Sequence, residues 1–104
     1  MTISVTAVSN SLTTVYTSTN NTAITYLNLT NTSGGAITVD IHVIPNGGSA
    51  GTTNAVAKTL SIAATDSYQL YSGGEKLLLA NGDFVQVVAS AASGINAVTS
   101  FTAI

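Results

Sequence analysis

The chain has 104 residues, of which 45% are hydrophobic and only 6% are charged, and its formal net charge at pH 7 is −2. A chain of this length forms one domain, 1–104, with a single small core. It contains no arginine, so it has no basic patch for nucleic acid or for an anionic membrane surface. The absence of cysteine excludes disulfides and thiolate metal sites.

The first half of the chain alternates between apolar and polar residues. The N-terminal segment lacks the positive region and the unbroken apolar run of a signal peptide, so we expect it to remain as a strand over 3–8. A short extended piece over 12–16 follows, and the two pieces are either two strands or one bent strand. The next strands run over 23–30 and 36–44. Turn residues at 31–35 separate these two strands and predict an antiparallel hairpin.

The strand over 36–44 carries the clearest pattern of the chain. Every second residue is apolar, which predicts one buried face made of Ile37, Val39, Ile41 and Val43. The opposite, mostly wet face then takes Thr38, Asp40 and His42. Pro45 cannot donate a hydrogen bond to a neighbouring strand, so the strand ends there.

The second half of the chain begins with a glycine-rich segment over 46–54, which predicts a loop. The segments 58–63 and 68–71 form another hairpin or a bent strand. The apolar run 76–79 ends at Asn81-Gly82, a strong hairpin signal. The last two predicted strands cover 84–90 and 96–104.

No segment of ten or more residues shows a 3.6-residue period, so the protein is predicted to be all-β. Seven or eight short strands separated by turn signals are typical of an antiparallel β-sandwich, either jelly-roll or immunoglobulin-like. A closed barrel is the second choice, because the strand lengths are unequal and the loop after Pro45 is long.

Asp40 and His42 are the first candidates for a chemical site. Residues i and i+2 of a strand share a face, and such a pair can hold a metal or orient an imidazole. His42 is the only histidine, and the favoured interpretation is a partly exposed strand histidine beside an acid. A hydrolase triad is disfavoured, because the sequence contains no Gly-x-Ser-x-Gly motif.

The other carboxylates do not form a catalytic pair in the sequence. Asp40, Asp66, Glu75 and Asp83 belong to four different predicted elements. Asp66 and Asp83 lie in turns, where a short acidic side chain accepts hydrogen bonds from backbone N–H groups. We therefore expect no enzyme, and no catalytic, metal-binding or cofactor-binding residue.

Four tyrosines are the candidate interface residues: Tyr16, Tyr26, Tyr68 and Tyr71. Aromatic rings with polar tips suit protein surfaces and carbohydrate alike. Tyr26 is opposite in phase to Leu27 and Leu29, which predicts that it lies on the outer face of its strand. For Tyr26 a protein interface is favoured over a glycan platform.

Three stretches give the chain a resemblance to known proteins: Leu-Asn-Leu-Thr-Asn-Thr-Ser-Gly-Gly at 27–35, Ile-Thr-Val-Asp-Ile-His-Val-Ile at 37–44, and Leu-Ala-Asn-Gly-Asp at 79–83 leading into 85–90. In these the chain resembles the small β-sandwich structural proteins of tailed bacteriophage particles, such as capsid cement (decoration) proteins and short tail or neck accessory proteins. The resemblance implies a protein that sits on the assembled capsid and ties shell subunits together. It brings no catalytic residue to any position.

The leading expectation is therefore a virion structural protein, a capsid cement protein, assembled in the host cytoplasm. Its partners would be the major capsid protein or other virion proteins, together with further copies of itself in a trimer or dimer. So few charged residues leave neutral faces that partners can cover. The alternative is a carbohydrate- or receptor-binding module of a tail fibre or neck appendage that uses the tyrosines and the loops. A small hydrolase is the third possibility.

Overall fold

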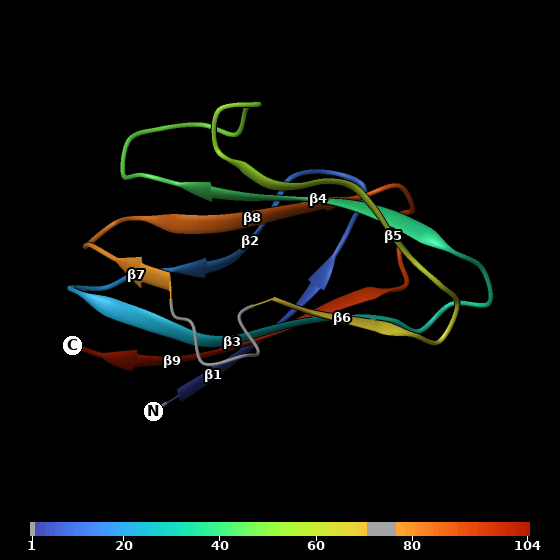
Figure 1. Ribbon diagram of the computed structural model, residues 1–104, viewed down its shortest axis with the longest axis horizontal. Helices are drawn as coiled ribbons and strands as arrows, with labels where there is room; N and C mark the ends of the chain where they lie inside the picture. Colours follow the sequence, from blue (N-terminus) through green and yellow to red (C-terminus); the bar gives the residue numbers. More distant parts are fainter. Residues whose placement is uncertain (1, 71–76) are drawn as a thin grey trace.

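The computed structural model describes residues 2–70 and 77–104, which form nine strands. Sheet A contains β1 (Thr2–Val8), β3 (Thr22–Asn31), β6 (Ser67–Leu70), β7 (Leu77–Leu79) and β9 (Ile95–Ala103). Sheet B contains β2 (Thr13–Thr17), β4 (Ile37–Ile44), β5 (Ala55–Ile62) and β8 (Phe84–Ala89). Figure 1 shows the two sheets as two layers. In the described part of the chain, no helix is long and apolar enough to cross a membrane. The predicted class, an all-β antiparallel sandwich, is confirmed.

The order of the strands identifies the type of sandwich. Sheet A has the order β1-β9-β3-β6, and sheet B has the order β2-β8-β4-β5. β7 pairs with the first half of β3 and β6 with its second half, so β6 and β7 together occupy one edge position. The nine described strands therefore fill eight positions, in the arrangement of a jelly roll. An immunoglobulin-like sandwich would instead keep its first two strands in one sheet.

Most of the predicted strand pairings are wrong, although the strands themselves are present. β3 and β4 do not form a hairpin, because β3 belongs to sheet A and β4 to sheet B. The same holds for β5 and β6, and for the two strands that flank Asn81-Gly82. β1 and β2 are likewise separate strands in different sheets. Among the described strands, β4 and β5 are the one pair of sequential neighbours that pair with each other.

The connection between β3 and β4 shows why the pairing could not be predicted. Asn31 is completely buried, and its amide Nδ2 donates to the carbonyl oxygens of Gly35 and Ile62, at 2.8 and 3.0 Å. Its Oδ1 accepts from the backbone N–H of Ser33 at 2.9 Å. These contacts turn the chain out of one sheet and into the other. Alternation in sequence predicts which face of a strand is buried, but it does not identify the neighbouring strand.

The core lies between the inner faces of the two sheets. In β4, Ile37, Val39 and Ile41 are at most 4% exposed, as predicted, and Val43 is half-buried against the same core. The other face of β4 is not uniformly wet, because Ile44 and His42 are buried on it. The prediction of a mostly wet outer face is therefore wrong at the C-terminal half of β4, where the loop over 45–54 folds back across the sheet (Figure 1).

Candidate functional site

The four tyrosines are not gathered on one surface. Tyr16 is 8% exposed, its hydroxyl donates to Thr22 Oγ1 at 3.0 Å, and its ring centroid lies 4.4 Å from that of Phe101. It is a core residue, so the prediction that it anchors an interface is wrong. Tyr68 is half-buried and also packs against the core. Tyr71 lies outside the described residues.

Tyr26 alone among the described tyrosines lies on an outer face. It is opposite Ser100 of β9, and its hydroxyl accepts a hydrogen bond from Gln69 Nε2 at 3.4 Å. The next two residues of β3 whose side chains point to the same side of the sheet, Asn28 and Thr30, are polar. The described tyrosines do not form a platform of several rings, which was one of the two features, with the loops, that the carbohydrate-binding alternative uses.

The Asp40 and His42 side chains occupy the outer face of sheet B, but no hydrogen bond or ion pair joins them. His42 is 7% exposed, and its Nδ1 lies 2.9 Å from Asn54 Oδ1. The partly exposed histidine expected from the sequence is therefore a buried one. The reason is the loop over 45–54, which returns to the sheet when the N–H of Val43 donates to the carbonyl of Asn54 at 3.0 Å.

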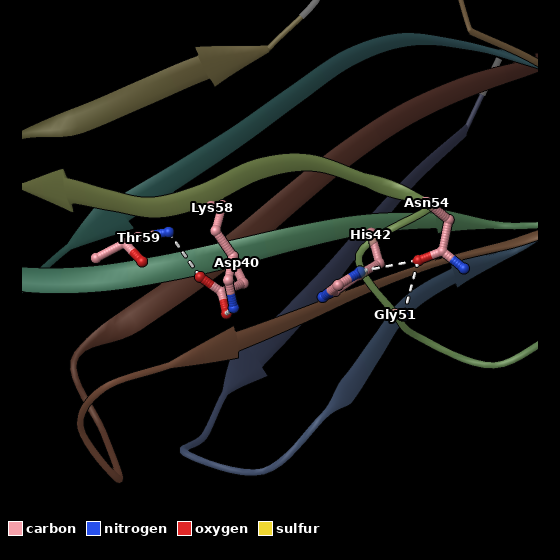
Figure 2. A network of polar contacts seen from close by, with 6 residues as sticks. All are labelled: Asp40, His42, Gly51, Asn54, Lys58 and Thr59. Atoms are coloured by element: carbon pink, nitrogen blue, oxygen red, sulfur yellow. Dashed lines mark hydrogen bonds and ion pairs between the residues drawn. The ribbon is translucent and has the colours of Figure 1, made fainter.

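Asn54 fixes the orientation of the imidazole. Its Oδ1 accepts from the backbone N–H of Gly51 at 3.1 Å, and its Nδ2 donates to the backbone carbonyl of Ser49 at 2.9 Å. These two backbone partners determine which end of the amide is oxygen. The atom facing His42 is thus an acceptor, and Nδ1 of the imidazole must carry the proton. In the neutral ring Nε2 is then the nitrogen that can accept a hydrogen bond. Figure 2 shows Asn54 between His42 and Gly51.

Asp40 stabilises an irregular part of the pairing between β4 and β5. Its Oδ1 accepts from the backbone N–H of Thr59 at 2.7 Å, and its Oδ2 lies 3.1 Å from Lys58 Nζ (Figure 2). The register between the two strands shifts here, and Thr59 has a φ of 52°. The Thr59 N–H, and to a smaller extent the Lys58 ammonium, hold the pKa of the Asp40 carboxyl below its ordinary value although burial opposes this.

A cavity of about 290 Å³ lies over His42 and is named the His42 cavity below. Its polar side chains come from His42, Thr52 and Lys58, and its apolar walls from Leu12, Ala50, Ala55 and Val88, with Gly51 between Ala50 and Thr52. The cavity is therefore mostly apolar, with three polar side chains. That composition is typical of a small-molecule site, although the volume is at the small end of the usual range.

The remaining carboxylates have structural roles. Asp66 Oδ1 accepts from the N–H of Ser67 at 2.8 Å. Asp83 accepts from the N–H groups of Asn46 and Ala80, both at 2.9 Å. The predicted capping roles are confirmed, while Glu75 lies outside the described residues. Among the described residues, no group of three histidines and carboxylates is placed to hold a metal.

A second candidate surface is the outward side of sheet A, which is named the sheet A outer face below. Opposite residues of adjacent strands define it in rows, such as Val5 with Val98 and Asn28, and Ile3 with Ser100 and Tyr26. The described residues of this face are Ile3, Val5, Ala7, Ala23, Tyr26, Asn28, Thr30, Ser67, Gln69, Leu78, Asn96, Val98, Ser100 and Thr102. None of them is charged.

β1 is the edge of this face, and it turns its apolar side chains outward. Ile3 and Val5 are 64% and 68% exposed. Ser4 and Thr6 point inward instead, because they are opposite the buried Thr99 and Ala97 of β9. β1 is therefore an edge strand with outward apolar side chains. None of its described residues is charged or a proline. Edges of that kind are prone to pair with another chain.

Asn54 and Lys58 are parts of the site that the sequence pattern does not predict. Asn54 lies in the segment predicted as a loop, and Lys58 at the start of a predicted strand. An asparagine at the end of a glycine-rich loop commonly holds such a loop together through hydrogen bonds to the backbone. This is the signal in the sequence that points to Asn54. The contact of Asn54 with His42 spans 12 residues and had no signal in the sequence.

Comparisons of the chain with protein-family models, with curated proteins and with solved structures found no match.

Proposed function

We propose that this protein is a structural protein of a virus particle, a capsid cement protein that binds the assembled shell through the sheet A outer face. The observation that carries the proposal is the composition of that face. Its described residues are uncharged, and its rim bears the exposed side chains of Ile3, Val5 and Leu78. Such a surface can be covered by a neutral protein surface without the cost of removing charges from water.

The positions of the charged residues also support binding through sheet A. The described charged residues Asp40 and Lys58 lie on the outer face of sheet B, and Asp66 and Asp83 lie in turns. Charge is one of the main features that keep β-sheets from associating, and the described residues of the sheet A outer face carry none. We infer that sheet A faces the partner and that sheet B faces away from it.

The fold alone does not choose the function. Jelly rolls occur in viral capsid proteins and also in lectin domains and cupins. The cement protein is favoured over the tail-fibre module because the sheet A outer face extends over five strands, whereas the described tyrosines do not share a surface.

Co-sedimentation with particles of the virus that encodes the chain tests the proposal. We expect the wild-type protein to pellet with purified shells, and Val5→Asp to remain in the supernatant. Val56→Asp is the matched control, because Val56 is also exposed, at 47%, but belongs to sheet B. It should pellet like the wild type. If the wild type does not pellet, or if both variants pellet equally, the proposal is wrong.

A further inference from the structure

The His42 cavity presents two polar groups of complementary kind, His42 and Lys58, beside the Thr52 hydroxyl. His42 Nε2 has a free lone pair because Asn54 fixes the proton on Nδ1, and Nε2 has no hydrogen-bond partner among the described residues. Lys58 supplies ammonium N–H groups, of which Asp40 takes one. The cavity can therefore accept one hydrogen bond from a ligand through His42 and donate another through Lys58.

The charge around the cavity favours an uncharged ligand. The Lys58 ammonium is paired with the Asp40 carboxylate at 3.1 Å, so the two groups together have no net charge. An anion would compete with Asp40 for Lys58, and a cation would be repelled by Lys58. A hydroxyl group can donate to His42, and a neighbouring hydroxyl can accept from Lys58, without disturbing that pair.

The size and the apolar walls restrict the ligand further. The volume of about 290 Å³ admits one six-membered sugar ring but not an extended oligosaccharide. Leu12, Ala55 and Val88 provide aliphatic contacts for the C–H side of such a ring. Leu12 is 50% exposed although it is a large apolar residue, and a ligand in the cavity would cover part of it.

We propose that the His42 cavity binds a neutral saccharide unit, with one hydroxyl donating to His42 Nε2 and another accepting from Lys58. The site lies on sheet B and does not depend on the proposed binding through sheet A. A protein attached to a shell by sheet A would leave this site accessible. The tyrosines have no part in it.

Titration of the ¹⁵N-labelled protein with glucose, galactose, mannose and N-acetylglucosamine, followed by NMR, tests this proposal. Concentrations up to about 100 mM cover dissociation constants in the millimolar range. We expect saturable shifts for at least one sugar, confined to His42, the loop residues 50–54 and Lys58. Long-range ¹H–¹⁵N spectra of the imidazole should show the proton on Nδ1 before and after the addition.

Two variants test the hydrogen bonds of His42 and Lys58 while they keep the packing of the two side chains. His42→Phe retains an aromatic ring without a nitrogen, and Lys58→Met retains the aliphatic stem without the charge. His42→Phe should weaken binding by about tenfold, since it removes a hydrogen bond to a buried group. Lys58→Met should weaken binding less, since the Lys58 side chain is 65% exposed and therefore hydrated in the absence of ligand. Thr38→Ala is the control, because Thr38 lies on the outer face of the same strand but does not line the cavity. It should bind like the wild type.

Several results would overturn the proposal. They are the absence of saturable shifts with all four sugars, shifts centred on Tyr26, unchanged binding by a folded His42→Phe variant, and a preference for glucuronic acid over glucose. Because the protein need not be attached to a shell in this experiment, its outcome is independent of co-sedimentation.

Discussion

Asp40 has a structural role that depends on its negative charge and is therefore lost when the carboxylate is protonated at low pH. Its carboxylate accepts from the N–H of Thr59, a residue whose φ of 52° is uncommon for a β-branched side chain. This hydrogen bond stabilises the irregular backbone of β5. The other carboxylate oxygen, Oδ2, contacts Lys58 Nζ at the wall of the His42 cavity. One carboxylate thus connects the stability of β5 with the shape of the cavity.

The Asp40→Asn variant should be less stable than the wild type at neutral pH only. In the folded protein the pKa of the Asp40 carboxyl lies below its ordinary value of 3.8, so this carboxyl binds a proton more readily in the unfolded chain. The stabilisation is complete above the ordinary pKa and is lost as the pH falls through the lowered one. We expect a difference in unfolding free energy of about 1 kcal/mol or less at pH 7, disappearing once the pH has fallen below the lowered pKa of Asp40.

Urea denaturation of the wild type and of Asp40→Asn, at pH 7 and at a series of lower pH values, measures this difference. Lys58→Met is the control, and it should retain most of the pH dependence because the Thr59 N–H is the larger influence on Asp40. A constant difference between wild type and Asp40→Asn at all pH values would contradict this role of the carboxylate.

Ile41 is the central core residue of β4 and should not tolerate a charge. It is completely buried, opposite the equally buried Val87 of β8. Ile41→Asp should lower the unfolding free energy by about 4 kcal/mol or more, a large part of the total for a domain of this size. Thr38→Asp, on the outer face of the same strand, is the control. A thermal melt of Ile41→Asp that equals the wild-type melt would contradict the assignment of the inner face.

At the scale of an element, β1 is the strand whose environment is incomplete in the monomer. Its seven residues pair with β9 on one side only. Antiparallel pairing of two copies about a two-fold axis at Val5 would place Ile3 opposite Ala7 of the other copy. The apolar outward side chains would then form one continuous row, and sheet A would continue from one copy into the next.

The Val5→Lys variant should therefore be a monomer under conditions in which the wild type is a dimer. Two lysines facing each other across the axis repel, and lysine is a common protection of edge strands. The folding stability should change by less than about 0.5 kcal/mol, since Val5 is largely exposed. Sedimentation velocity measures the change, with Val56→Lys as the control on sheet B. A wild type that is monomeric at all concentrations would contradict this pairing.

At the scale of the whole molecule, the sequence predicted the strands well and their neighbours poorly. Alternation along 37–44 correctly identified Ile37, Val39 and Ile41 as core residues, because burial of one face has a period of two. It could not show that β3 and β4 lie in different sheets, since a turn such as 31–35 fits a hairpin and a sheet crossing equally well. The closure of the jelly roll depends on contacts such as Asn31 with Ile62, which is 31 residues away.

The candidate sites were less predictable than the fold. The outward position of Tyr26 followed from its phase along β3, but the burial of Tyr16 depends on the distant Phe101. The cavity over His42 exists because a glycine-rich loop returns to the sheet through Asn54. Such returns are determined by tertiary hydrogen bonds and have no local pattern in the sequence.

The proposal that sheet A binds a viral shell is tested most directly by cryo-electron microscopy of the particle. We expect density for this chain on the outside of the shell, with the sheet A outer face buried in contacts and His42 on the exposed side. The contact should bury about 1,200 Å² or more in total, as specific interfaces do. A map in which sheet A faces solvent, or a purified particle without this chain, would contradict the proposal.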